Sequence, residues 1–123
     1  MFYVQGFLRR GRPAMAGLRF LARSQTDDVL AYLLALALQH GLGLWLGLPA
    51  RDHALIWVTT SLVLFAEVLN TALESAVDRV GTEHHALAGR AKDLAAGAVF
   101  LAVFIALVCA LLLLLPPLVS RFG

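Results

Sequence analysis

The sequence has few charged residues and a single cysteine, and the shortage of charge already restricts the classes of protein to which it can belong. Charged side chains make up 15% of the 123 residues, whereas 60% are hydrophobic. A soluble domain averages about 25% charged and about 45–50% apolar residues. The composition therefore excludes an ordinary soluble fold, and it excludes disorder because disordered chains are poor in apolar residues. The length excludes a dinucleotide-binding domain or a TIM barrel, which leaves a small integral membrane protein.

Few side chains in the apolar part of the chain could react or bind a partner. Cys109 is the single cysteine and lies inside an apolar segment, so no disulfide forms within the chain and a packing role is favoured. We interpret His40 and His53 as interfacial or packing residues. The formal net charge of +2 gives no indication of a nucleic-acid partner. The positions of the charges are therefore more informative than their sum.

Three apolar segments each reach the length of about 20 residues that a helix needs to cross about 30 Å of hydrocarbon. None of them alternates between apolar and polar residues as the strands of a membrane barrel do. The sequence thus predicts an all-α membrane protein with three transmembrane helices in a single domain, 1–123, and we expect the third helix to fray at the Pro116-Pro117 pair. The predicted transmembrane helices are 29–48, 54–76 and 94–119.

Residues 1–28 differ from the three spans, because arginines there alternate with apolar side chains. From Pro13 onward the pattern predicts a basic amphipathic helix that lies on the membrane surface. Proline is well placed in the first turn of such a helix. A solvated basic tail is the alternative interpretation. The arginines of this region are Arg9, Arg10, Arg12, Arg19 and Arg23.

Lysine and arginine are divided unequally between the two sides of the predicted spans. One side holds the five arginines of 1–28 and the three basic residues between the second and third spans, and the other holds Arg51 and Arg121. Because basic loops stay in the cytoplasm, this ratio of eight to two places the amino terminus and the second connection there.

The second span carries a stripe of polar side chains. At about 100° per residue, the members of the stripe share one face of a helix. Glu67 is the deepest member, roughly 20 Å from Ala54 at about 1.5 Å per residue. A carboxylate at such a depth costs at least about 2.5–3 kcal/mol, so it must be neutral, paired or facing a wet cavity. A solvated helix extension explains the two members nearest the cytoplasm equally well. The stripe comprises Glu67, Asn70, Thr71, Glu74 and Asp78.

The connection after the second span adds further polar residues. Glu83, His84 and His85 suggest zinc, but adjacent histidines rarely reach one metal ion without further ligands, and no cysteine accompanies them. Lys92 and Asp93 lie where the third span begins. Lysine suits a phosphate group and aspartate supplies an oxygen ligand, while a snorkelling interfacial pair is the alternative.

Oxygen ligands, a lysine and a basic helix on one side of a membrane suit Mg²⁺ and phosphate, since Mg²⁺ prefers one or two carboxylates together with substrate phosphates. A deeper carboxylate on the same face could take a proton from a lipid hydroxyl. The combination indicates phosphoryl transfer to a membrane lipid, although the sequence contains no phosphate-binding loop and no protein-kinase motif. Small residues at 95–98 favour close helix packing. Three spans cannot enclose an acidic stripe alone, so we expect a homo-oligomer.

The segment 67–93 contains a longer pattern. Its core reads E-V-L-N-T-A-L-E-S-A-V-D from Glu67 to Asp78 and continues with R-V-G, followed by E-H-H at 83–85 and G-R-A-K-D at 89–93. In these residues, and in its three spans, its amino-terminal helix and its Arg-Phe-Gly ending, the chain closely resembles the prokaryotic diacylglycerol kinase family over nearly its whole length.

This resemblance implies a homotrimer in the bacterial cytoplasmic (inner) membrane, with active sites shared between subunits and with ATP and Mg²⁺ as co-substrate and cofactor. It implies that Glu67 is the catalytic base and contacts the lipid, that Glu74 binds the magnesium of MgATP, and that Arg9 and Ala96 are further lipid contacts. The ATP-binding positions carried over are Asn70, Glu74, Asp78, Glu83, His84, His85, Lys92 and Asp93.

Two positions depart from the family pattern. Gln25 stands where the family usually has a glutamate that shares the metal, so an oxygen is kept and a negative charge is lost. We expect weaker metal binding unless Asp27 or Asp28 compensates. Arg9 matches its family counterpart only across a gap in the alignment.

The expected reaction transfers the terminal phosphate of MgATP to diacylglycerol and gives phosphatidic acid. Arg79, Gly89-Arg90 and the carboxyl terminus resemble Gram-negative diacylglycerol kinases, whereas 95–99 resembles the branch that phosphorylates undecaprenol, so an undecaprenol kinase is the alternative. A small ion-conducting oligomer lined by the Glu67 stripe is an alternative of a different class. A third alternative is a subunit that binds nucleotide without turnover, because Gln25 replaces the usual glutamate that shares the metal.

Overall fold

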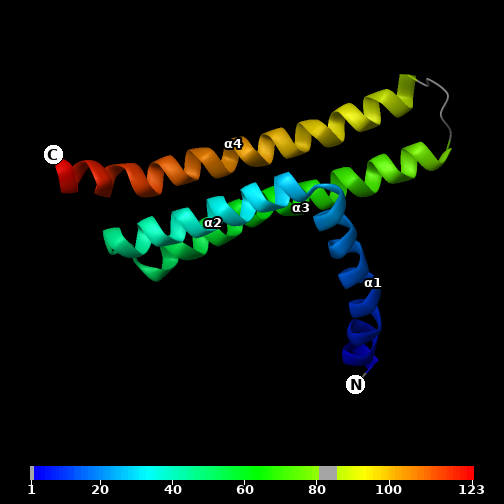
Figure 1. The fold of residues 1–123 in the computed structure, drawn as a ribbon, viewed down its shortest axis with the longest axis horizontal. Coiled ribbons are helices and arrows are strands. Elements are labelled where there is room, and N and C mark those ends of the chain that lie inside the picture. The colour runs from blue at the N-terminus through cyan, green and yellow to red at the C-terminus, as the bar shows by residue number, and fades with distance from the viewer. Residues whose placement is uncertain (1, 81–85) are drawn as a thin grey trace.

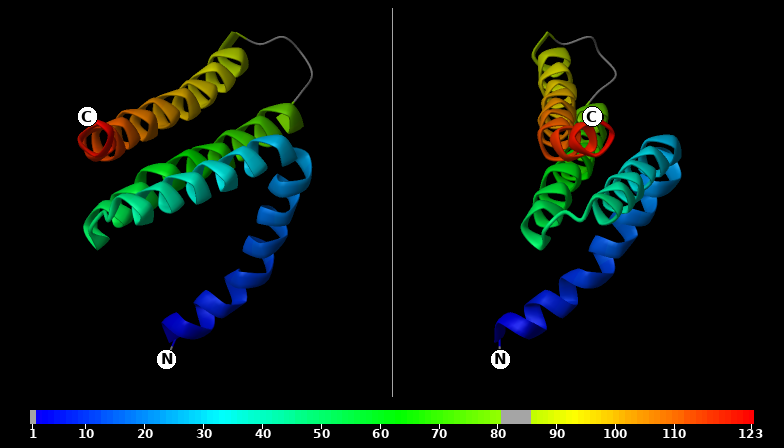
Figure 2. Two further views of the ribbon diagram at one scale, coloured as in Figure 1. Left: turned by 60° about the vertical axis from the view of Figure 1, so that its left-hand side comes forward. Right: turned by 90° about the vertical axis from the view of Figure 1, so that its left-hand side faces the viewer.

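The structure, a computed structural model, describes residues 2–80 and 86–123. Within these ranges its regular structure consists of four helices. Helices α2, α3 and α4 lie side by side, and α1 leaves this bundle at one end and carries the amino terminus away from it (Figures 1 and 2). Three helices are long and apolar enough to cross a membrane, which confirms the predicted all-α fold with three spans. The helices are α1 (Phe2–Ser24), α2 (Thr26–Leu46), α3 (Ala50–Val80) and α4 (Ala86–Phe122).

A short turn at residues 47–49 makes α2 and α3 antiparallel neighbours. Gly47 has φ 73°, a left-handed conformation that favours glycine, and its N–H donates to the carbonyl of Leu44. The N–H of Leu48 donates to the carbonyl of Gly43 at 2.9 Å. These bonds satisfy two of the last four carbonyls of α2, and the chain turns directly into α3. We refer to this end of the bundle as the hairpin end.

The expectation that the third span frays at Pro116 and Pro117 is wrong, because α4 continues through both prolines to Phe122. Each proline lacks the N–H that would bond four residues back, which weakens the helix locally. The last turn also contacts α2 at Trp45. The guanidinium of Arg121 lies 4.3 Å from the ring centroid of Trp45, and the Phe122 ring lies 5.9 Å from the same residue.

Side-chain hydrogen bonds join α2 to α3 at three levels of the bundle. Burying apolar side chains gives little advantage in lipid, so close packing and polar contacts between helices carry much of the association, at about 0.6 kcal/mol for an average bond. These three bonds fix the register of α2 on α3. They join Tyr32 Oη to Ser61 Oγ at 3.1 Å, Gln39 Nε2 to Thr60 Oγ1 at 3.1 Å, and His40 Nδ1 to His53 Nδ1 at 2.7 Å.

Gly43 is buried where α2 meets the beginning of α3, and a methyl group there has no room. A Cβ at this position would lie 2.9 Å from Cε1 of His53 and 3.2 Å from Cδ1 of Leu48. We predict that Gly43→Ala lowers the free energy of unfolding in detergent micelles by about 1–3 kcal/mol through overpacking.

Gly41→Ala is the matched control, because a Cβ at Gly41 has no neighbour within 4 Å. We expect it to be neutral or to stabilise the helix by about 0.5–1 kcal/mol. Denaturant titrations of the two variants test the packing at the hairpin end, and equal effects of the two substitutions would contradict it.

Candidate functional site

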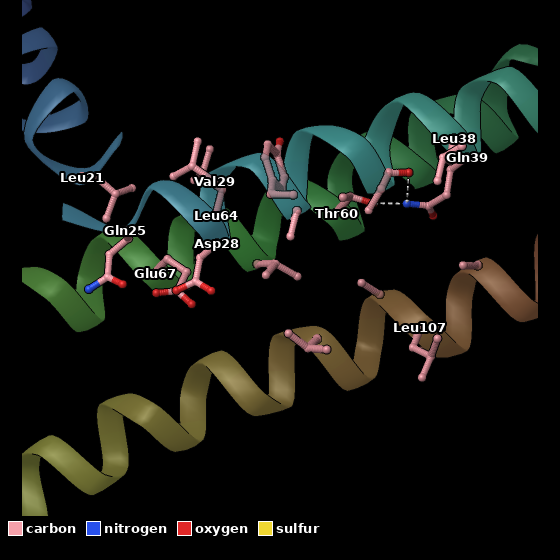
Figure 3. Close-up of a pocket in the computed structure, with 17 residues that line it drawn as sticks. Leu21, Gln25, Asp28, Val29, Leu38, Gln39, Thr60, Leu64, Glu67 and Leu107 are labelled. Atoms are coloured by element: carbon pink, nitrogen blue, oxygen red, sulfur yellow. Dashed lines mark hydrogen bonds between the residues drawn. The ribbon is translucent and has the colours of Figure 1, made fainter. Parts of the chain in front are cut away.

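A cavity of about 520 Å³ lies between α2, α3 and α4. Most of its wall is apolar, with side chains such as Val29, Leu64 and Leu107. Polar groups are concentrated at its two ends, and Figure 3 shows Gln25, Asp28 and Glu67 at one end and Gln39 with Thr60 toward the other. The cavity therefore combines a carboxylate end with a long apolar body, which suits a ligand that has a polar head and a hydrocarbon tail.

Glu67 is half-buried on α3 and lines the carboxylate end of the cavity. The close-up shows that its carboxylate and that of Asp28, from the first turn of α2, point toward the same region (Figure 3). Gln25 precedes α2 at the bend between α1 and α2, and its N–H donates to the carbonyl of Leu21 at 2.8 Å. The fold thus brings a second carboxylate and an amide to the residue expected to be the base.

The polar stripe of α3 continues from Glu67 toward the α1 end of the bundle. Asn70 Nδ2 donates to Glu74 Oε1 at 3.3 Å, so these two side chains share a face of the helix as predicted. Asn70 Oδ1 and Thr71 Oγ1 are buried without a hydrogen-bond partner among the described residues. Buried polar atoms are rarely left unpaired, and these oxygens are therefore available to a ligand.

Lys92 and Asp78 join α4 to α3 at the α1 end of the bundle. Lys92 Nζ donates to Asp78 Oδ1 at 2.7 Å, and the two side chains are 39% and 66% exposed. Asp93 is the next residue and is exposed. Lys92 therefore lies at the water-accessible end of the polar stripe. It and Asp78 are partly exposed, and each is the ion-pair partner of the other.

Several of the predicted site residues do not meet in this cavity. Arg9 is exposed on α1, which leaves the bundle, and Ala96 is exposed on α4; neither lines the cavity. Glu83, His84 and His85 lie outside the described residues. Within the two described ranges, no group of three or more histidine, cysteine or acidic side chains could hold a metal ion alone.

Sequence reasoning missed Tyr32, Gln39 and Thr60 as cavity residues. Each is a polar residue inside an apolar segment, and that isolation is the signal that could have identified them. It also left Asp27 and Asp28 as equal candidates beside Gln25. In the structure Asp28 lines the cavity with Glu67, whereas Asp27 lines only a separate hollow at the bend between α1 and α2.

A profile of the prokaryotic diacylglycerol kinase family matches residues 12–114, which includes the second half of α1 and most of α4. The chain belongs to this family. Diacylglycerol kinase of Escherichia coli is 40% identical over 79 residues, and the aligned segment covers 64% of this chain and 62% of that protein. Diacylglycerol kinase of Synechocystis is 46% identical over 99 residues, covering 80% of this chain and 53% of that protein.

An undecaprenol kinase of Bacillus subtilis is 50% identical over 52 residues, 42% of each chain. The chain therefore spans less than two thirds of the length of these curated relatives. Members named for two different lipids align with it, so family membership alone leaves the lipid open.

Because the Lys92–Asp78 ion pair is partly exposed, it contributes little to the free energy of unfolding. We predict that Asp78→Asn lowers the free energy of unfolding in micelles by less than about 1 kcal/mol, because solvent screens such a pair. Asp93→Asn is the control, since Asp93 makes no ion pair within the described part of the chain. A loss of several kcal/mol in Asp78→Asn alone, measured by denaturant titration, would contradict this interpretation.

Proposed function

We propose that this chain is an ATP-dependent lipid kinase, which transfers the terminal phosphate of MgATP to the hydroxyl of diacylglycerol and gives phosphatidic acid. The observation that carries the proposal is the placement of Glu67, a half-buried carboxylate at the carboxylate end of an apolar cavity between three membrane helices. Membership of the diacylglycerol kinase family supports the same reaction class.

Glu67 accepts the proton of the lipid hydroxyl in this proposal. The hydroxyl oxygen then forms a bond to the terminal phosphorus of ATP, the bond from that phosphorus to the bridging oxygen breaks, and ADP leaves. The apolar body of the cavity holds the hydrocarbon tail and keeps water away from the reacting hydroxyl. Positioning of the two substrates supplies much of the rate, as is general for phosphoryl transfer.

The donor atoms near the stripe fit a magnesium ion carried by ATP. Glu74 offers a carboxylate, and the buried, unpartnered Oδ1 of Asn70 offers a neutral oxygen close to it. Mg²⁺ uses few protein ligands when phosphates and water supply the rest, which agrees with the lack of a complete protein cage in the described ranges. When bound, Mg²⁺ neutralises charge on the phosphates.

The nucleotide is assigned to the α1 end of the bundle. In this proposal the ion pair between Lys92 and Asp78 breaks, and Lys92 then binds a phosphate of ATP. Asp78 and Asp93 contact the nucleotide. Glu83, His84 and His85 are proposed nucleotide contacts from the family resemblance alone. The exposure of Lys92 and Asp78 supports access by a water-soluble substrate.

The proposed setting is the bacterial cytoplasmic (inner) membrane, with α1 and the α1 end of the bundle on the cytoplasmic side. Supporting this, α1 runs away from the bundle (Figure 2) and carries five arginines beside exposed apolar residues such as Phe7 and Leu18. An amphipathic helix of that composition binds an anionic surface. We further propose a homotrimer, in which exposed Arg9 and Ala96 reach the lipid of a shared site.

Undecaprenol is the second candidate substrate, favoured by the aligned kinase of Bacillus subtilis. A panel of lipid alcohols incubated with the purified protein and ATP labelled in its terminal phosphate tests the reaction and the substrate together. Labelled phosphatidic acid supports the first candidate, and labelled undecaprenyl phosphate supports the second. Ion conductance in liposomes with no labelled lipid would overturn the kinase.

We predict that Glu67→Gln abolishes phosphate transfer, with a loss of at least about 100-fold in kcat, since a general base contributes about 10²–10⁴-fold. The amide keeps the size of the side chain, so assembly and helix content should be preserved. Thr71→Val is a useful comparison because it changes a neighbouring polar position without removing a base. Undiminished turnover in Glu67→Gln would remove Glu67 from its role.

A magnesium titration tests how the chain tolerates Gln25. We predict that Gln25→Glu lowers the Mg²⁺ concentration for half-maximal activity by about tenfold, equivalent to about 1.4 kcal/mol, because a charge is restored. If an aspartate compensates for the missing charge at Gln25 in the native chain, Asp28→Asn raises the Mg²⁺ concentration for half-maximal activity more than Asp27→Asn does. The reason is that, of the two aspartates, Asp28 alone lines the cavity with Glu67. The compensation would be excluded if Gln25→Glu did not lower the Mg²⁺ concentration for half-maximal activity and neither aspartate variant raised it.

A further inference from the structure

Two histidines face each other at the hairpin end of the bundle, far along the helices from Glu67. His40 belongs to α2 and His53 to the first turn of α3, and their Nδ1 atoms lie 2.7 Å apart. The ring planes are 13° from parallel and the centroids are 5.0 Å apart. The rings therefore meet edge to edge through their nitrogens, with an N–H of one directed at the lone pair of the other.

The surroundings confine both rings. The ring centroid of Trp57 lies 5.2 Å from that of His40. The backbone of Gly43 lies close to the His53 ring, since a Cβ at Gly43 would be only 2.9 Å from Cε1 of His53. Both Nε2 atoms are buried and have no partner among the described residues. Within the described part of the chain, the contact between the two Nδ1 atoms is therefore the hydrogen bond that these rings share.

The hydrogen bond between the two Nδ1 atoms persists when the pair of rings gains one proton and is lost when it gains two. A neutral pair has one N–H between the facing nitrogens, and a singly protonated pair keeps the same bond in a stronger, charge-assisted form. A second added proton gives both facing nitrogens an N–H and places two positive charges on adjacent rings. The bond is then lost and the rings repel each other.

Other charges near the hairpin end are few. On α3, Arg51 and Asp52 precede His53 and form an ion pair with 3.6 Å between Nε and Oδ1. From α4, Arg121 approaches α2 at Trp45. On α2, the acidic residues are in the first turn, at the opposite end of the helix. One carboxylate that already has a partner does not neutralise two imidazolium groups.

We propose that His40 and His53 form a proton-sensitive clasp, which holds α2 to α3 at the hairpin end while it carries at most one added proton and opens when both rings are protonated. The adjacent Gln39 bonds Thr60 at the end of the cavity remote from Glu67. Opening the clasp therefore also loosens that end of the cavity. Acid on the hairpin side of the membrane weakens the helix pair, whichever lipid the protein phosphorylates.

Thermal unfolding in detergent micelles at about pH 7.5 and about pH 4.5, on either side of the ordinary titration range of histidine, tests the clasp. We expect the unfolding midpoint of the native chain to fall by at least about 4 °C more than that of His40→Gln or His53→Gln. Tyr32→Phe is the control, because it removes a different α2–α3 hydrogen bond, to Ser61, and leaves both histidines in place. It should lower the midpoint equally at both pH values.

NMR of the native chain with ¹⁵N-labelled histidine gives a second measurement that does not depend on a variant folding. We expect two histidines with a coupling between their Nδ1 atoms at neutral pH, and loss of that coupling on acidification together with charging of both rings. Equal acid sensitivity of the native chain and both histidine variants would overturn the clasp. So would two rings that titrate independently with no coupling at any pH.

Discussion

The hydrogen bonds between α2 and α3 fix the position of every cavity residue that α2 contributes. Tyr32 bonds Ser61 one helical turn from Asp28 and less than two turns from Glu67. In an antiparallel pair, a contact at that level places Asp28 opposite Glu67. Each bond contributes modestly, but an unpaired polar side chain in hydrocarbon costs several kcal/mol. A one-residue slip of α2 would therefore leave several polar groups unpaired at once, and the same bonds that hold the helices together also specify their register.

The proposed chemistry requires a base within the membrane and a nucleotide in water, and the stripe on α3 connects the two. Glu67 and Asp78 are separated by eleven residues of continuous helix, or about 16 Å at about 1.5 Å per residue. Along that distance the side chains change from half-buried at Glu67 to exposed at Asp78. A lipid hydroxyl can remain near the apolar cavity while the phosphates approach from the exposed end, so neither substrate has to leave the solvent that suits it.

The sequence predicts the number of helices and the polar face of α3, because both depend on local patterns: apolar length and a period of 3.6 residues. It does not predict which side chains of α2 meet α3, since that register depends on the short turn at 47–49 and on pairings such as Gln39 with Thr60. The same limit explains why Asp27 and Asp28 could not be separated. The continuation of α4 through its two prolines is not predicted for a related reason, because its last turn contacts Trp45, which is distant in sequence.

A single chain accounts for only part of the proposed site. Arg9 lies on a helix that leaves the bundle, and Ala96 is exposed in a segment of small residues, 95–98. Neither lines the cavity of its own chain, and the small residues suit close contact with another membrane helix. The carboxylate end of the cavity, by contrast, is lined within one chain by Gln25, Asp28 and Glu67. In the proposed homotrimer, the lipid contacts of Arg9 and Ala96 therefore come from a neighbouring copy, whereas the position of the proposed base is fixed within one chain.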